Sequence, residues 1–312
     1  MEWWHALVLG VLQGIAEFLP ISSSGHLVLV QQFFPLIGEQ ASAALFFDGM
    51  LHLGTTFAVA WYLTRERSWH DPVPNFSSES PSPPCDEKSS HGHARSDTPG
   101  SGAVWHTESE PTARTLSWWN WLWLLGWGSG PAVLTVLLLD RSIRESFVSA
   151  PLVAVNFLCL GTLLWLTDQL PAGKITLSEL RWYHGVLIGM GQALSAVMRG
   201  LSRSGMTLAV ALLLNVERLS AVRYSFALAL IANLGLAGLG CLNLLRAEDS
   251  ASWLNADFMT KTAVATLVSA AVGYLTLKPL LNLVRRARLR WFSYYLWSVG
   301  LLAWWHYVAR SG

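Results

Sequence analysis

The chain has 312 residues, of which 52% are hydrophobic and 13% charged, and its formal net charge is +1. Soluble domains carry about a quarter charged residues, so this composition favours a protein that sits in a hydrocarbon environment. A nearly neutral chain without a clustered basic face also argues against nucleic acid as a partner. Many of the 17 tryptophans stand at the ends of apolar runs, as at Trp118 and Trp305, where amphipathic rings settle at the headgroup boundary of a bilayer.

The first apolar stretch, Ala6–Val30, is interrupted by polar residues, glycine and Pro20, so it cannot cross a bilayer as an unbroken apolar helix. A helix before the break places Gln13 and Glu17 on one face. The loop after it supplies hydroxyls, free backbone amides and an imidazole, an arrangement that can bind an anion: Ser22, Ser23, Ser24, Gly25 and His26. Ionisable groups inside a membrane are usually functional. The structural alternative is that serine and histidine only cap a helix in a re-entrant turn.

Six longer apolar runs follow, each close to the length that spans a bilayer as a helix. They are Ala41–Leu63, Trp118–Leu139, Pro151–Thr167, Ala221–Leu245, Thr262–Leu283 and Trp291–Val308. Residues 65–115 are rich in Ser, Pro and Gly, which predicts a flexible polar loop within a single membrane domain covering 1–312. Three histidines in this loop could bind metal by composition, but a solvated linker is favoured.

Asp48 and His52 lie four residues apart in the first of these runs, so they share a helix face. They either face the same polar cavity as the first loop or form a polar packing pair. Towards the other end, the basic cluster that includes Arg288 and Arg290 is expected in the cytoplasm, so that the last helix runs outward. The N-terminus shows no pattern of a cleaved signal peptide.

A second broken apolar stretch, Gly185–Leu214, carries polar residues at its interruption: Arg199, Ser202, Arg203, Ser204, Gly205 and Thr207. The planar fork of donors on Arg203 suits phosphate oxygens and stays charged when buried. The alternative is that Arg203 extends to the membrane interface.

The two broken stretches resemble each other. Gly10–Gly14 matches 189–193, and the Ser-Ser-Ser-Gly of 22–25 matches the Ser-Arg-Ser-Gly of 202–205. Such repeats in membrane proteins are often related by a pseudo-two-fold axis, with the functional site at their interface. We therefore predict an all-α integral membrane protein with an inverted repeat, two re-entrant helical hairpins and about six transmembrane helices, its halves covering approximately 1–140 and 150–312.

Together the two loops suit phosphoryl transfer at a lipid diphosphate. Arg203 and loop amides would hold phosphate oxygens, and Ser23 or His26 would attack or position a water. Glu17 would orient or deprotonate the attacking group, with or without a divalent metal. All of this requires Glu17 and Arg203 to meet in one cavity.

The stretch from Gly10 to His26 resembles the first signature of the undecaprenyl-diphosphate phosphatase family, also known as the bacitracin-resistance protein family. Arg199–Thr207 resembles its second signature, and Asp48, His52 and the Tyr-Ser-Phe run at 224–226 also fit its pattern. The resemblance implies hydrolysis of undecaprenyl diphosphate to undecaprenyl phosphate and inorganic phosphate, which recycles the carrier lipid for peptidoglycan synthesis. It also implies the bacterial inner (plasma) membrane, a site facing the periplasm, and Mg²⁺ or Ca²⁺ as cofactor. A homodimer is one alternative for the oligomeric state.

By the same resemblance, four residues take the catalytic and phosphate-binding places: Glu17, Ser23, His26 and Arg203. The residues expected to bind substrate are Gln13, Ser22, Ser24, Gly25, Ser202, Ser204, Gly205 and Thr207. Asp48, His52 and Arg199 are secondary candidates, and Glu17 with Gln13 is the candidate metal pair. The nucleophile stays open between Ser23 and His26.

Two departures from the family's pattern stand near the site. Arg199 replaces the family's Pro, and Ala232-Asn233 stands where the family usually has Pro-Ala. Among rivals, a phosphatase of the phosphatidic-acid type needs a His where this chain has Ala209. A polyprenyl-phosphate transporter or flippase, which the inverted repeat would also suit, stays as the alternative from another class.

Overall fold

The structure, a computed structural model, describes residues 2–33, 41–65, 117–139, 149–247, 255–285 and 288–311. These residues form ten α-helices, one short 3-10 helix and no strand beyond an isolated bridge between Ile175 and Val216. The all-α prediction is therefore confirmed within these ranges. The predicted polar loop lies outside the described residues except for Arg65, and Arg286 of the basic cluster also lies outside them.

Five helices are long and apolar enough to cross a membrane. They are α3 (Ala41–Arg65), α4 (Trp118–Leu138), α6 (Ala150–Asp168), α9 (Arg218–Arg246) and α11 (Ala256–Arg285). Each coincides with a predicted run. The last helix, α12 (Arg290–Ser311), forms where the sixth span is expected but is not among the five, because its Trp, Tyr and Ser residues reduce its hydropathy. The described residues thus support five spans where about six are expected.

The two interruptions fall where the sequence predicts them. The first separates α1 (Trp3–Ala16) from α2 (Ser23–Phe33), and the second separates α7 (Trp182–Val197) from α8 (Arg203–Leu213). A residue in the left-handed region turns the chain at each break, Ser22 with φ 70° and Gly200 with φ 99°. Glycine adopts this conformation without steric cost, whereas serine does so only where its surroundings hold it.

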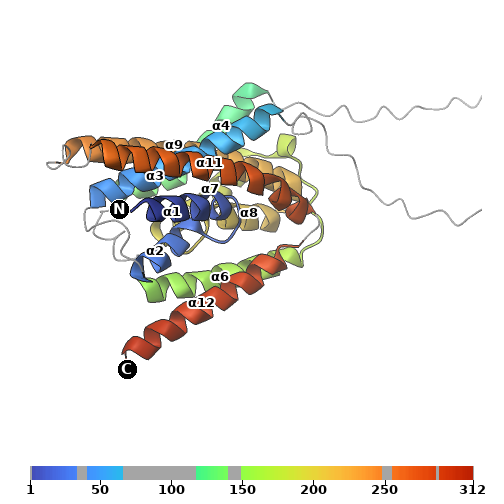
Figure 1. The fold of residues 1–312 in the computed structure, drawn as a ribbon. Coiled ribbons are helices and arrows are strands. Elements are labelled where there is room, and N and C mark those ends of the chain that lie inside the picture. Colours follow the sequence, from blue (N-terminus) through green and yellow to red (C-terminus); the bar gives the residue numbers. More distant parts are fainter. Residues whose placement is uncertain are drawn as a thin grey trace, which may run out of the picture. The chain divides into compact units, whose positions relative to one another are not determined.

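Glycine also sets how closely the helices pack. α3 packs against α9 and α11, α11 packs against α1, α4 packs against α7, and α6 packs against α12. A Cβ at Gly10 of α1 would lie 2.7 Å from the carbonyl oxygen of Ala265, and one at Gly49 of α3 would lie 2.9 Å from the Cα of Ala237. Small residues at such contacts let membrane helices approach each other's backbones. Figure 1 shows α1, α2 and α8 between the helices α3, α9 and α11 on one side and α6 and α12 on the other.

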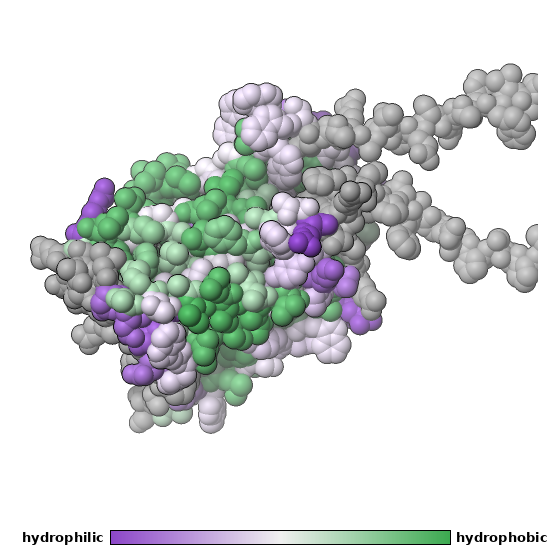
Figure 2. Space-filling view, turned by 45° about the horizontal axis from the view of Figure 1, so that its top comes forward, coloured by the Kyte–Doolittle hydropathy of each residue, from purple (hydrophilic) through white to green (hydrophobic). Residues whose placement is uncertain are grey.

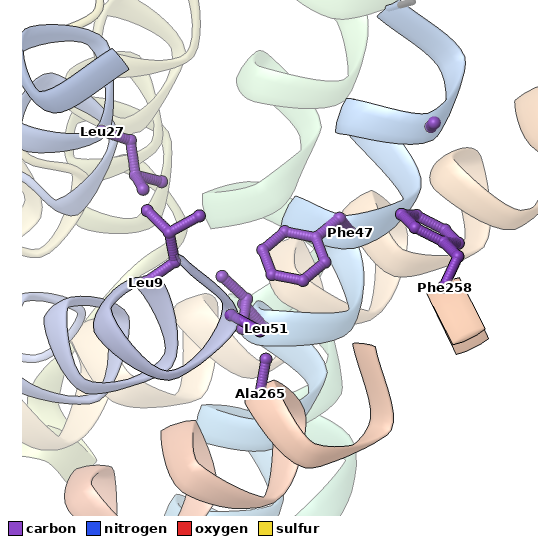
Figure 3. Packing of buried hydrophobic residues seen from close by; sticks show 8 residues of the cluster. Leu9, Leu27, Phe47, Leu51, Phe258 and Ala265 are labelled. Atoms are coloured by element: carbon purple, nitrogen blue, oxygen red, sulfur yellow. The ribbon is translucent and has the colours of Figure 1, made fainter. Parts of the chain in front are cut away.

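A buried apolar cluster packs the hairpin formed by α1 and α2, the first hairpin, against the long helices α3 and α11 (Figure 3). Its labelled members come from α1, α2, α3 and α11: Leu9, Leu27, Phe47, Leu51, Phe258 and Ala265. Outside this core, large apolar side chains are exposed, and Figure 2 shows extended apolar areas on one face. Leu137 is 76% exposed and Leu275 is 71% exposed. Soluble monomers rarely expose such large apolar patches, so this surface and the five spans are those of a multi-pass membrane protein.

Candidate functional site

The centre of the site is the buried carboxylate of Glu17, at the C-terminal cap of α1. Its Oε2 accepts hydrogen bonds from Gln13 Nε2 at 3.0 Å and from Ser23 Oγ at 3.1 Å. The first contact confirms that the four-residue spacing places both side chains on one helix face. The second shows that the chain reverses at Ser22 and brings the start of α2 back to the end of α1.

Arg203, the first residue of α8, reaches Glu17 from the second loop. Its Nη2 donates to Glu17 Oε1, so the two residues form an ion pair between segments 186 positions apart in the sequence. A side chain after the second break also reaches the backbone of the first loop, because Ser204 Oγ donates to the carbonyl oxygen of Leu19 at 3.3 Å. The expectation that Glu17 and Arg203 meet is confirmed.

Matching serines shape both loops. Ser22 Oγ accepts a hydrogen bond from the backbone N–H of Gly25 at 3.2 Å, and Ser202 Oγ accepts one from the N–H of Gly205 at 3.1 Å. In each case a serine hydroxyl satisfies a free N–H group in the first turn of the following helix. The structure therefore gives Ser22 and Ser202 a capping contact. Their expected role in binding substrate remains a prediction.

Asp48 and His52 of α3 reach the same network. His52 Nε2 lies 3.3 Å from Glu17 Oε2, and His52 Nδ1 lies 2.9 Å from the carbonyl oxygen of Asp48 and 3.5 Å from its Oδ1. Of the two alternatives for this pair, the structure favours a place in the same polar network as the first loop over simple packing. The Glu17 carboxylate thus has partners on α1, α2, α3 and α8.

His26 points in a different direction from Ser23. Its Nδ1 lies 2.7 Å from the carbonyl oxygen of Ser22, and its Nε2 lies 2.7 Å from the hydroxyl of Tyr295 on α12. Because a carbonyl can only accept, Nδ1 carries the proton, and the tyrosine hydroxyl then donates to Nε2. Both ring nitrogens of His26 are thus engaged by partners other than Glu17.

The remaining predicted residues lie around this centre. Thr207 Oγ1 lies 2.6 Å from Ser225 Oγ and donates to the carbonyl oxygen of Arg203 at 2.9 Å, so its hydroxyl supports α8 from behind. Ser24 is half-buried. The backbone carbonyl of Arg199 accepts a hydrogen bond from Asn156 Nδ2 at 2.7 Å, which ties the second break to α6.

Two residues that contact this network are not among the predicted site residues. Asn233 of α9 donates from Nδ2 to Glu17 Oε1 at 3.0 Å and accepts from Arg203 at its Oδ1. Tyr295 of α12 holds His26. For Asn233 the sequence offers a usable signal, since a carboxamide inside an apolar span needs a buried partner. For Tyr295 it offers none, because aromatic residues are frequent throughout α12.

Three polar atoms at the site have no hydrogen-bond partner among the described residues, although each is buried: Gln13 Oε1, Asp48 Oδ1 and Arg203 Nε. A donor and two acceptors thus remain for a ligand. Oxygen atoms of this kind are what Mg²⁺ and Ca²⁺ prefer. Over the same ranges there is no group of three His, Cys, Asp or Glu side chains placed to hold a metal ion.

Comparison with known proteins finds one family over nearly the whole chain. A family model described as bacitracin resistance protein BacA matches residues 6–302. A protein of Desulforapulum autotrophicum named undecaprenyl-diphosphatase is 35% identical over 308 residues, which cover 97% of this chain and 98% of that protein. Proteins with the same name from Desulfosudis oleivorans and Methanobrevibacter smithii are 34% and 30% identical, and each alignment covers at least 96% of both chains.

Proposed function

Because the chain belongs to the bacitracin resistance protein BacA family, we propose that it hydrolyses undecaprenyl diphosphate to undecaprenyl phosphate and inorganic phosphate. The observation that carries this proposal is the contact between Glu17 and Arg203, with Ser23 on the same carboxylate. An acid, a hydroxyl and a guanidinium that converge from two separate loops are the groups that phosphoryl transfer needs. The prenyl chain would lie in the bilayer while its diphosphate enters the polar site. Reaction of this kind recycles the carrier lipid for peptidoglycan synthesis.

Ser23 is the nucleophile in this proposal. Its hydroxyl already donates to Glu17 Oε2 at 3.1 Å, so the carboxylate is placed to take the proton as Ser23 Oγ attacks the terminal phosphorus. The bond to the bridging oxygen breaks, undecaprenyl phosphate leaves, and water then releases phosphate from Ser23. His26 fits a supporting role better, because its ring nitrogens are engaged by Ser22 and Tyr295.

Arg203 is the phosphate-binding residue in this proposal. Its Nε is buried and has no partner among the described residues, so one N–H remains for a phosphate oxygen while Nη2 holds Glu17. The hydroxyl of Ser24 and the backbone amides of both loops that no serine caps would add donors around the same anion.

A divalent cation, Mg²⁺ or Ca²⁺, is part of the proposal, with Gln13 and Glu17 as the residues that would hold it. The unpartnered Gln13 Oε1 supports this assignment, since a buried amide oxygen without a donor suits a hard cation. When bound, such an ion would neutralise part of the charge on the diphosphate. In this proposal Glu17 would share in holding the ion and would also accept the proton of Ser23, while its Oε1 stays paired with Arg203.

The finer architecture and location also belong to the proposal. We infer an inverted repeat with two re-entrant hairpins, α1–α2 and α7–α8, in the bacterial inner membrane, with the site open to the periplasm. The matched serine caps and the equal helix–break–helix order of the two hairpins support the repeat. Labelling of a single cysteine at Ser24, in a variant without the three native cysteines, tests the orientation. Reaction with an impermeant reagent from the periplasmic side is expected, and reaction only from the cytoplasm would contradict it.

Phosphate release from a prenyl diphosphate by the purified protein tests the activity. We expect release that stops when divalent cations are chelated and returns when Mg²⁺ or Ca²⁺ is restored. Arg203→Ala and Glu17→Ala should abolish release while the protein stays folded in detergent. Normal release by both variants would refute the assignment of the site. A bound lipid that is never cleaved would favour the transporter alternative, which the names of the relatives do not support.

The nucleophile has its own test. Ser23→Ala should abolish release, whereas Ser24→Ala, a matched change one residue further, should only weaken it. A phosphoserine at position 23 after rapid acid quenching is the expected intermediate. Full activity of Ser23→Ala would exclude Ser23 as the nucleophile.

A further inference from the structure

Asn233 lies within α9, a helix that belongs to neither hairpin, yet its side chain contacts one residue from each. Its Nδ2 donates to Glu17 Oε1 at 3.0 Å, and its Oδ1 accepts from Arg203 Nη2. The residue is 1% exposed. Both ends of one carboxamide are therefore engaged by the ion pair at the centre of the site.

Packing alone does not explain an asparagine at this position. A carboxamide buried in an apolar helix costs free energy unless its donor and acceptor are both satisfied. Leucine has nearly the same branched shape and would fill the space without that cost. The two hydrogen bonds are therefore what distinguishes Asn233 from the apolar residues that surround it along α9.

The contacts also divide the Glu17 carboxylate into two sides. Asn233 and Arg203 hold Oε1. Oε2 faces Ser23 Oγ at 3.1 Å, together with Gln13 Nε2 at 3.0 Å and His52 Nε2 at 3.3 Å. Without the Asn233 donor, Arg203 alone holds Oε1, and the orientation of the carboxylate is fixed less tightly. Without the Asn233 acceptor, the Arg203 guanidinium loses the second group that fixes its plane.

We propose that Asn233 is a positioning residue for phosphate release: it fixes the Glu17 carboxylate and the Arg203 guanidinium against each other so that Glu17 Oε2 faces Ser23. This inference rests on the proposed function. It assigns a role to a helix outside both signature loops, at a position where the chain departs from the family's pattern.

The shape-matched variant Asn233→Leu tests the proposal. We expect kcat for phosphate release to fall about 10- to 100-fold, the scale seen when a supporting hydrogen bond or a small misplacement disturbs a reacting group. KM should change little, because Arg203 itself is retained. The melting temperature in detergent should fall, because Arg203 loses an acceptor and Glu17 loses a donor, so kcat is measured at a temperature at which the variant is fully folded. Asn243→Leu is the matched control: it is the same exchange on the same helix at an exposed position, and it should leave kcat unchanged.

Different outcomes separate a positioning role from a structural one. A folded Asn233→Leu protein with the kcat of the wild type overturns the proposal. A loss of kcat that is fully explained by the fraction of unfolded protein at the assay temperature overturns it too. If the leucine variant does not fold, Asn233→Gln, which keeps the carboxamide, should retain more kcat than Asn233→Ala, and equal values overturn the proposal. Failure of the wild-type protein to release phosphate would instead overturn the proposed function, and this inference with it.

Discussion

The Glu17→Gln substitution removes the charge of the central carboxylate and turns one of its oxygens into an NH₂ group. In the structure Oε1 accepts from Arg203 and Asn233, and Oε2 accepts from Gln13 and Ser23. If the new NH₂ group replaces Oε1, it faces the donors of Arg203 and Asn233. If it replaces Oε2, it faces the NH₂ group of Gln13, and the Ser23 hydroxyl must turn round to accept from it. The isosteric change leaves the packing volume the same, so its effect reports on charge and hydrogen bonding.

Two costs determine the size of the effect on stability. A buried donor that loses its acceptor costs about 1–3 kcal/mol. Removing one partner of a buried ion pair costs about 3–5 kcal/mol, because the other charge is left without a partner. The two overlap, since Arg203 is both the unpaired charge and one of the donors. Its side chain is 22% exposed, so we place the total destabilisation at the lower end, about 3 kcal/mol.

The effect on activity should be larger than that on stability. If Glu17 takes the proton of Ser23, its loss as a general base should lower kcat about 10²- to 10⁴-fold. Thermal unfolding in detergent and phosphate release by the same preparation measure both quantities. Glu179→Gln serves as control, because Glu179 is exposed and outside the site. It should leave kcat unchanged and lower the melting temperature less than Glu17→Gln does. A Glu17→Gln protein with the melting temperature and kcat of the wild type would refute the reasoning.

Three further predictions concern packing and the connecting segment. Gly10→Ala should destabilise the protein by about 1–3 kcal/mol, because the new Cβ would lie 2.7 Å from a carbonyl oxygen of α11. Gly126→Ala, at a position with open space around it, should stabilise the protein by about 0.5–1 kcal/mol. Thermal unfolding compares the two variants, and equal effects would contradict the packing argument. Tyr224→Phe should cost about 1 kcal/mol, because the buried hydroxyl donates to a backbone carbonyl of α4 at 2.7 Å; an unchanged melting temperature would speak against that bond. The backbone N–H of Thr176 donates to the Glu179 carboxylate and lowers its pKa below the ordinary value. At pH values above the ordinary pKa, the ionised carboxylate therefore stabilises the 3-10 turn η2 (Leu177–Glu179). This stabilisation is lost as the pH falls through the lowered pKa. Amide exchange in the turn, corrected for its intrinsic pH dependence, should lose protection over that interval, and constant protection would contradict the assignment.

Local rules acting on the sequence decide the two helix breaks and the face that carries the acid. Pro20 disfavours helix before it, and the Ser/Gly runs supply caps, so both interruptions appear where they are expected. The four-residue spacing likewise places Gln13 beside Glu17. These features depend on neighbours within about one helical turn, which is the range over which sequence patterns report structure.

The partners of these residues across the protein were decided by helix packing. Asn233 reaches Glu17 across 216 positions and Tyr295 reaches His26 across 269, and no periodicity links residues so far apart. Whether His52 belongs to the site or is only a packing residue also depends on tertiary structure, because the packing of α3 is what brings its Nε2 within 3.3 Å of Glu17. The sequence identifies the polar and ionisable side chains within the apolar segments. The close packing of helices at glycine positions determines which of these side chains contact each other.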